Sequence, residues 1–196
     1  MVLGFALASA SAFADAAPAV DRVALRNELA AQRQINLKRF RDYRVKRIYP
    51  HNTYQNGPLN VWTDADGHLC AVATLMDKAG MHDLVETTAH DKNFVRVADL
   101  ASGPLIDWVL TSGFTQEEIV MIQQPTQAYI DEMNWEDRVA RRKLKRQRAR
   151  EDNRLEANYV AIHRMLEARV MSDASLDLAV ARLAARPELA AQLHAR

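Results

Sequence analysis

No proline or glycine interrupts the chain between Pro125 and Pro187. Proline breaks a helix because it lacks a backbone N–H and clashes with the preceding turn, and glycine weakens a helix through its conformational freedom. So long a stretch without either residue favours long helices. We predict one helix from about Gln127 to Val170, which would extend roughly 65 Å at the standard rise per residue. The chain is therefore expected to be mainly α-helical.

The two halves of this predicted helix differ in character. The range 138–150 contains eight basic residues and no acidic one. The second half instead carries an apolar seam at helical spacing, made of Leu155, Tyr159, Ile162, Leu166 and Val170. A helix that projected alone into water could not hide this seam, so another segment must cover it.

Three coverings for the seam are open. Residues 175–194, which are rich in Ala and Leu, can fold back after a break at Ser172-Asp173, and the last helix of this segment is expected to begin at Pro187. The N-terminal helix can cover the seam with Leu25 and Leu29. A second copy of the chain would instead form a homodimer through Leu155, Tyr159, Ile162 and Leu166. We favour a covering within one chain.

The segments before Pro125 predict further helices. Residues 21–44 lack Gly and Pro and carry apolar residues at near-helical spacing. Short helices are expected from Leu69 to a glycine stop at Gly80, from about residue 81 to 90, and from Pro104 to Gly113. Thr115 and Glu118 have the spacing of a capping box, in which each side chain bonds the other residue's backbone amide, so one more helix begins there.

One β-hairpin is predicted, near residues 59–69. The segment 59–63 and the pair His68-Leu69 flank Asp64-Ala65-Asp66-Gly67, whose Asp and Gly residues favour a tight turn.

The predicted fold is thus mainly α, a small helical domain with one short β-hairpin and a long C-terminal helical arm. We expect the globular domain to span residues 15–125 and the arm with its terminal helices 126–196. The expected core includes Trp62, Leu69, Val72, Met76, Trp108 and Ile122.

Residues 1–14 are expected to be a signal peptide. They carry no charge, contain an apolar stretch and end in Ala12-Phe13-Ala14, a small-x-small pattern that signal peptidase accepts. The mature chain would begin near Asp15 in the periplasm or outside the cell. No other apolar run approaches the roughly 20 residues that span a bilayer.

Cys70 is the only cysteine of the chain, so the fold has no internal disulfide. At the start of a predicted helix, a cysteine can be activated as a nucleophile by the helix dipole and a neighbouring histidine. The alternative enzyme is therefore a thiol hydrolase or transferase with Cys70 as nucleophile and His68 or His90 as base. Because apolar residues flank Cys70 and free cysteine is often buried, we favour a structural role.

The sequence gives only weak indications of metal binding or DNA binding. His82, Glu86 and His90 share one face of a helix at spacings of four, but they lack an intervening acid–base motif, so we predict no metal site and no cofactor. The two short helices around Ser112–Thr115 resemble a helix-turn-helix. The second of them contains no Lys or Arg, so we reject DNA reading there.

The basic range offers a better candidate for binding. Arg141, Arg142, Lys145, Arg146 and Arg148 can form a patch for a polyanion, whether nucleic acid, an acidic envelope polymer or anionic lipid headgroups. Export makes nucleic acid the least favoured of these partners.

Part of the chain carries a recognisable pattern. Residues 64–73 read D-x-x-G-x-x-C-A-V-A, residues 112–118 read S-G-F-T-x-x-E, and Ile122-Gln123 follow. Over about residues 50–125 the chain resembles an uncharacterised domain of exported bacterial proteins, from which it departs at Ala73, where glycine is expected, and at Phe114, where leucine is expected. The resemblance implies export and a recurring module, and it implies no mechanism.

These observations favour an exported, non-enzymatic interaction or structural module with a protein or envelope partner. The thiol enzyme and the polyanion-binding protein are the two alternatives.

Overall fold

The computed structural model describes residues 20–128, 138–170 and 173–194. The predicted signal peptide, the start of the predicted long helix before residue 138 and Ser172 lie outside these residues. Within the described residues the chain forms eight α-helices and one short 3-10 helix. Among these helices, none combines the length and the apolar character needed to cross a bilayer.

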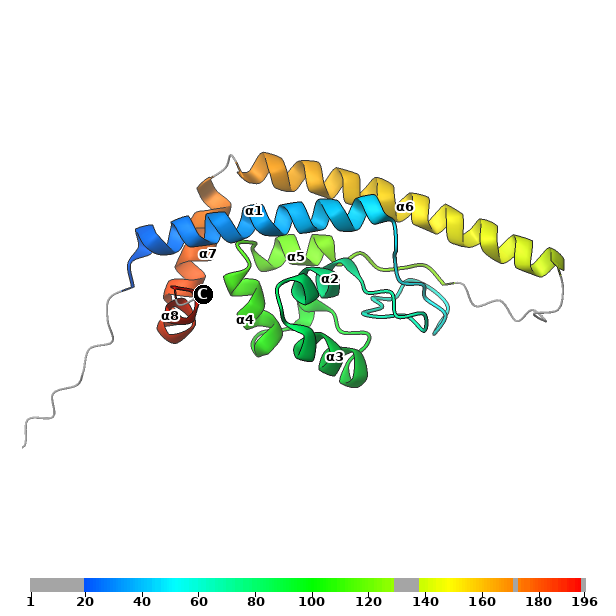
Figure 1. Cartoon of the computed structure of the whole chain (residues 1–196), viewed down its shortest axis with the longest axis horizontal. Helices are drawn as coiled ribbons and strands as arrows, with labels where there is room; N and C mark the ends of the chain where they lie inside the picture. Colours follow the sequence, from blue (N-terminus) through cyan, green and yellow to red (C-terminus); the bar gives the residue numbers. More distant parts are fainter. Residues whose placement is uncertain (1–19, 129–137, 171–172, 195–196) are drawn as a thin grey trace, which may run out of the picture.

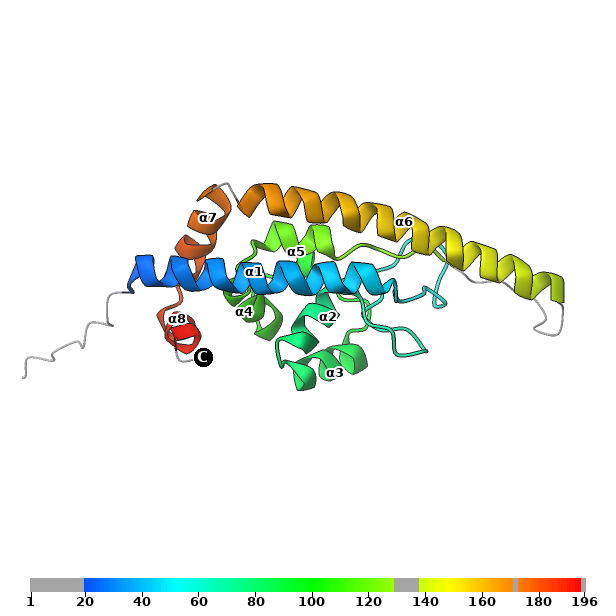
Figure 2. The same ribbon diagram turned by 45° about the horizontal axis from the view of Figure 1, so that its top comes forward.

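Two long helices form one side of the molecule (Figures 1 and 2). Helix α1 spans Arg22–Lys46 and α6 spans Arg138–Val170, and the two lie side by side. Asp21 is the N-cap of α1, and its carboxylate accepts hydrogen bonds from the amides of Val23 and Ala24 at 2.9 and 3.0 Å. Both helices therefore confirm the expectation of a mainly α-helical chain.

The shorter helices pack against these two. Their bounds are α2 Ala71–Lys78, α3 His82–Asp91, η1 Val97–Asp99, α4 Pro104–Thr111, α5 Gln116–Ile122, α7 Asp173–Ala184 and α8 Pro187–His194. The predicted starts at Pro104 and Pro187 are confirmed, as is the capping box of Thr115 and Glu118. Helices α7 and α8 lie against the N-terminal part of α1, and α2 to α5 lie beneath its middle and C-terminal part (Figure 1).

The apolar seam of α6 is buried within one chain. Leu155, Tyr159, Ile162 and Leu166 belong to the main core together with Phe40 and Tyr43 of α1. The Tyr159 ring meets the rings of Phe40 and Tyr43 edge-on, at centroid distances of 5.5 and 5.6 Å. The predicted covering within the chain is confirmed, so the seam needs no second copy. The side chain of Val170 lies outside the described residues.

The seam of α6 is covered neither by residues 175–194 nor by Leu25 and Leu29, the two coverings within one chain that the sequence suggested. The seam packs against the second half of α1, whereas Leu25 and Leu29 from the first half pack in a separate cluster with α7 and α8. Residues 175–194 thus bury Leu25 and Leu29 instead of the seam. This cluster consists of Leu25, Leu29, Leu176, Ala179, Val180, Leu183, Ala190 and Leu193.

A buried ion pair joins four helices. Arg33 of α1 donates to both carboxylate oxygens of Glu118 at 2.7 and 2.9 Å, and neither side chain is more than 1% exposed. Arg33 also donates to the carbonyl of Leu166 in α6, and the hydroxyl of Ser175 in α7 donates to Glu118. The same Glu118 accepts the backbone amide of Thr115 in the capping box of α5. The pair therefore fixes α1, α5, α6 and α7 relative to one another.

The predicted β-hairpin is wrong. Among the described residues there is no strand, only isolated bridges, of which Thr63–Leu69 is the one within the expected hairpin. The turn itself forms, because the Gly67 amide donates to the carbonyl of Asp64 at 3.1 Å. Other bonds of the expected first strand lead elsewhere, since Leu59 exchanges two hydrogen bonds with Thr126 and the Trp62 amide donates to the carbonyl of Asn93. Without consecutive cross-strand pairs, no ladder extends from the turn.

Candidate functional site

The turn at residues 64–68 is organised by one buried carboxylate. Asp64 Oδ1 accepts the backbone amides of Asp66 and His68 at 3.0 and 2.8 Å. Its other oxygen, Oδ2, accepts the amide of His51 at 3.0 Å. These bonds are the side-chain-to-backbone contacts typical of aspartate in turns. Asp64 therefore brings the His51 loop, which follows α1, against the turn that precedes α2.

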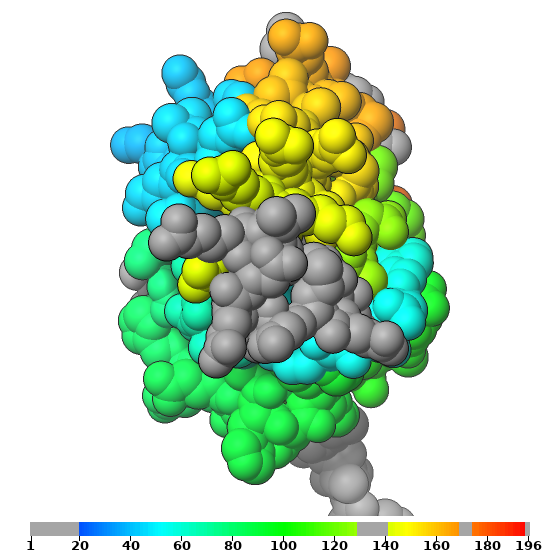
Figure 3. Space-filling view, turned by 90° about the vertical axis from the view of Figure 1, so that its right-hand side faces the viewer, coloured from blue at the N-terminus to red at the C-terminus, as the bar shows by residue number. Residues whose placement is uncertain are grey.

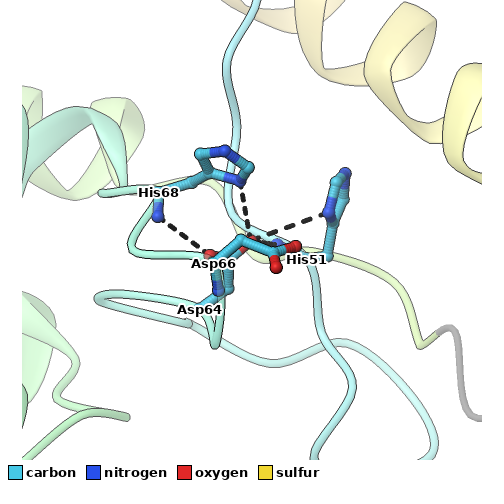
Figure 4. A group of neighbouring side chains, drawn as sticks. All are labelled: His51, Asp64, Asp66 and His68. Carbon is cyan, nitrogen blue, oxygen red and sulfur yellow. Dashed lines mark hydrogen bonds and ion pairs between the residues drawn. The ribbon is translucent and has the colours of Figure 1, made fainter.

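Two imidazoles and two carboxylates converge at this point (Figure 4). The Nδ1 atoms of His68 and His51 lie 3.1 and 3.6 Å from the same Asp64 Oδ2. The two rings meet edge-on with a centroid distance of 6.0 Å. One ligand-type atom from each of His51, Asp64, Asp66 and His68 lies within 4.8 Å of all the others. We call these four residues the His–Asp cluster.

Helix α6 borders the His–Asp cluster. The Nε2 atom of His51 lies 3.7 Å from Asp152 Oδ1. Burial lowers the pKa of His51 and the nearby Arg148 guanidinium lowers it further, while the carboxylates of Asp152 and Asp64 act in the opposite direction. Burial raises the pKa of Asp152. The net lowering favours the neutral imidazole of His51, the form that can act as a metal ligand.

Sequence reasoning missed the His–Asp cluster. The D-x-D-x-H spacing of residues 64–68 was the available local signal, since it places three ligand-type side chains in one short turn. His51 joins this turn, and Asp152 borders it, from distant parts of the chain, and no spacing rule connects them to residues 64–68. The three residues considered as metal ligands, His82, Glu86 and His90, are all exposed and form no such group among the described residues.

Cys70 is buried, as predicted, with 4% of the residue exposed. It is the N-cap of α2, where its Sγ accepts the backbone amide of Ala73 at 3.4 Å. Burial raises the pKa of the Cys70 thiol to about 11, although backbone amides lower it in part. Of the two histidines considered as its base, His68 is bonded to Asp64 and His90 is exposed on α3 beside Asp91. This environment opposes formation of a thiolate.

We expect Cys70 to react slowly with an aromatic disulfide reagent in the folded protein. Burial shields the Cys70 thiol from the reagent, and its raised pKa leaves less thiolate at pH 7 than an ordinary cysteine has. The labelling rate of the native chain should therefore be more than about tenfold below the rate in denaturant. Equal rates in the two conditions would show that Cys70 is accessible and reactive, as the thiol enzyme requires.

The basic range lies on the outside of the molecule. Its first turns extend past the C-terminal end of α1 (Figures 1 and 2), and Figure 3 views this end of α6, coloured yellow. Arg141, Arg142, Lys145 and Arg146 are exposed. Arg148, the fifth residue of the predicted patch, is only partly exposed, and its charge lowers the pKa of His51. Four of the five predicted residues therefore present their charges to solvent.

No protein family, no curated protein and no solved structure matches this chain in sequence or fold. The resemblance to an exported bacterial domain therefore stays a prediction. Three residues of its pattern have structural roles here, since Asp64 organises a turn, Cys70 caps α2 and Glu118 pairs with Arg33. The pattern describes this fold without indicating a reaction.

Proposed function

We propose that the protein is an exported, non-enzymatic binding module whose basic arm, residues 138–150 of α6, holds a linear anionic polymer of the cell envelope. The observation that carries the proposal is the exposure of Arg141, Arg142, Lys145 and Arg146 on a helix segment that extends past α1. Export is supported by the apolar, uncharged pattern of residues 1–14.

Residues 141–150 contain six exposed cations, and the spacing of four of them, Arg141, Arg142, Lys145 and Arg146, suits an extended polyanion. Residues at positions i, i+1, i+4 and i+5 share one side of a helix. They cover about 7.5 Å along the axis at the standard rise, so several anionic groups of one polymer can contact them together. No acidic residue interrupts the range 138–150, so the local potential is positive along this surface.

The same segment is poorly suited to insertion into a membrane. Between residues 141 and 150 the only apolar residues are Leu144 and Ala149. An interfacial helix needs a continuous apolar face that enters the acyl region. The composition therefore favours a soluble polymer over a lipid surface. The buried thiol of Cys70 makes the alternative hydrolase the weaker hypothesis.

The test is the binding of full-length chain to fluorescent polyphosphate, measured by anisotropy at low salt. Replacing Arg141, Arg142, Lys145 and Arg146 together with glutamine should weaken binding at least about tenfold. The variant neutralises fewer phosphates, so fewer counterions leave the polymer when the protein binds. The matched control replaces four exposed basic residues elsewhere with glutamine, namely Arg22, Lys38, Lys92 and Arg164. It removes the same charge and should change the affinity by less than about threefold.

Two results would contradict the proposal. Equal weakening by the two quadruple variants would show a response to net charge alone. Binding to vesicles containing phosphatidylglycerol without binding to polyphosphate would assign the arm to membrane surfaces.

A further inference from the structure

We propose that His51, Asp64, Asp66 and His68 bind one divalent first-row transition metal ion, with Zn²⁺ as the best fit. This proposal does not rest on polymer binding by the basic arm. It rests on the convergence of four ligand-type side chains from two separate loops (Figure 4).

The distances between donor atoms match those of a metal site. Zinc bonds of about 2.0–2.1 Å to nitrogen and oxygen place neighbouring ligands of a tetrahedral ion roughly 3.3 Å apart. The Nδ1 atoms of His68 and His51 lie 3.1 and 3.6 Å from Asp64 Oδ2, on either side of that value. The ligand atoms of the four residues all lie within 4.8 Å of one another, so modest side-chain movements bring them to bonding distance of one ion.

The donor types select the class of metal. Two imidazole nitrogens with two carboxylate oxygens suit zinc and its first-row neighbours, whereas Ca²⁺ and Mg²⁺ prefer oxygen ligands alone. The two carboxylates also neutralise the charge of a divalent ion. Asp152, 3.7 Å from His51 Nε2, is placed to orient that ring from outside the ligand set, as carboxylates do for metal-bound histidines.

The cluster is both held in place and open to solvent. The Asp64 side chain is only 3% exposed, and three backbone amides fix it. His68 is 35% exposed, and Asp66 lies at the surface. A metal ion can therefore enter from the side of Asp66 and His68 without opening the core. Binding through His68 Nδ1 uses the neutral ring with its proton on Nε2, and any proton displaced from Nδ1 passes to solvent.

A purely structural role for the cluster makes a different prediction about Asp66. The bonds that hold the turn come from Asp64, so a structural role needs no carboxylate at residue 66. Metal binding does need it. Asp66→Asn is therefore the decisive variant, and since Asp66 is exposed, the substitution leaves the fold intact.

The experiment titrates purified full-length chain with Zn²⁺ alone, in competition with a chromophoric chelator. We expect one bound ion per chain, and at least about tenfold weaker binding for Asp66→Asn and for His68→Gln. The matched controls are Asp91→Asn and His90→Gln, which alter an exposed His–Asp pair on α3 with an Nδ1–Oδ1 distance of 2.6 Å. These controls should bind Zn²⁺ as the native chain does.

Three outcomes would overturn the metal site. They are a native chain that binds no Zn²⁺, an affinity unchanged by Asp66→Asn and His68→Gln, and equal losses in the α3 controls. Circular dichroism of every variant establishes that the helices are retained, so that weaker binding reports the ligands alone.

Discussion

Glu118→Ala is expected to destabilise the protein by about 3–5 kcal/mol, because it leaves the guanidinium of Arg33 buried without its charge partner. The substitution also removes the acceptor for the Thr115 amide at the start of α5. Since the free energy of unfolding of typical domains is only about 5–15 kcal/mol, the substitution would remove a large part of it. Urea unfolding followed by circular dichroism measures this change.

The neighbouring residue supplies the control. Glu117 pairs with Arg182 at 3.0 Å, but its side chain is 61% exposed. Exposed ion pairs contribute about 0–1 kcal/mol, so Glu117→Ala should have little effect. Replacing Arg33 and Glu118 together with Met and Leu should recover part of the loss, because no buried charge then remains. Equal effects of the two single substitutions would contradict the central role of the buried pair.

Gly113→Ala is expected to cost about 2–5 kcal/mol. Its backbone φ is +79°, a left-handed conformation that costs other residues roughly 1–2 kcal/mol. A Cβ atom at this position would also lie 2.3 Å from the carbonyl oxygen of Leu29 and 2.5 Å from the amide nitrogen of Arg33. Relieving this overlap moves the backbone of α1 away from residue 113, at about 1–3 kcal/mol. The midpoint of thermal unfolding should fall accordingly.

Gly67→Ala separates the two causes of this effect. Gly67 has nearly the same φ, +81°, yet nothing lies within 4 Å of a Cβ placed there. Its substitution should therefore cost only the backbone term of roughly 1–2 kcal/mol. If both alanine variants unfold at the same temperature, the close approach of α1 to Gly113 does not govern stability.

Local signals in the sequence predicted most of the helices. The capping box at Thr115, the proline starts at Pro104 and Pro187 and the glycine after α2 each act within one turn of a helix, so neighbouring residues suffice to detect them. The hairpin failed for the opposite reason. Its turn is local, but whether flanking residues form strands depends on their partners, and Leu59 found its partner at Thr126.

The two candidate sites also differ in whether their residues are close together in the sequence. The basic arm was visible in the sequence because eight charges lie within 13 consecutive residues, 138–150. The His–Asp cluster was not visible, because His51 reaches Asp64 only after α1 ends and the loop folds back onto the turn. Likewise, the sequence could show that the seam of α6 needed a cover, but the choice between the two halves of α1 and residues 175–194 depended on the tertiary packing.

The most direct test of the basic arm is the salt dependence of polyphosphate binding. If exposed arginine and lysine side chains hold the polymer, the logarithm of the affinity should fall linearly with the logarithm of salt concentration. Replacing Arg141, Arg142, Lys145 and Arg146 with glutamine should make that slope shallower by roughly 0.7 for each phosphate that the arm no longer neutralises. An affinity that does not change with salt, or the same slope in the native chain and the variant, would contradict the proposed function.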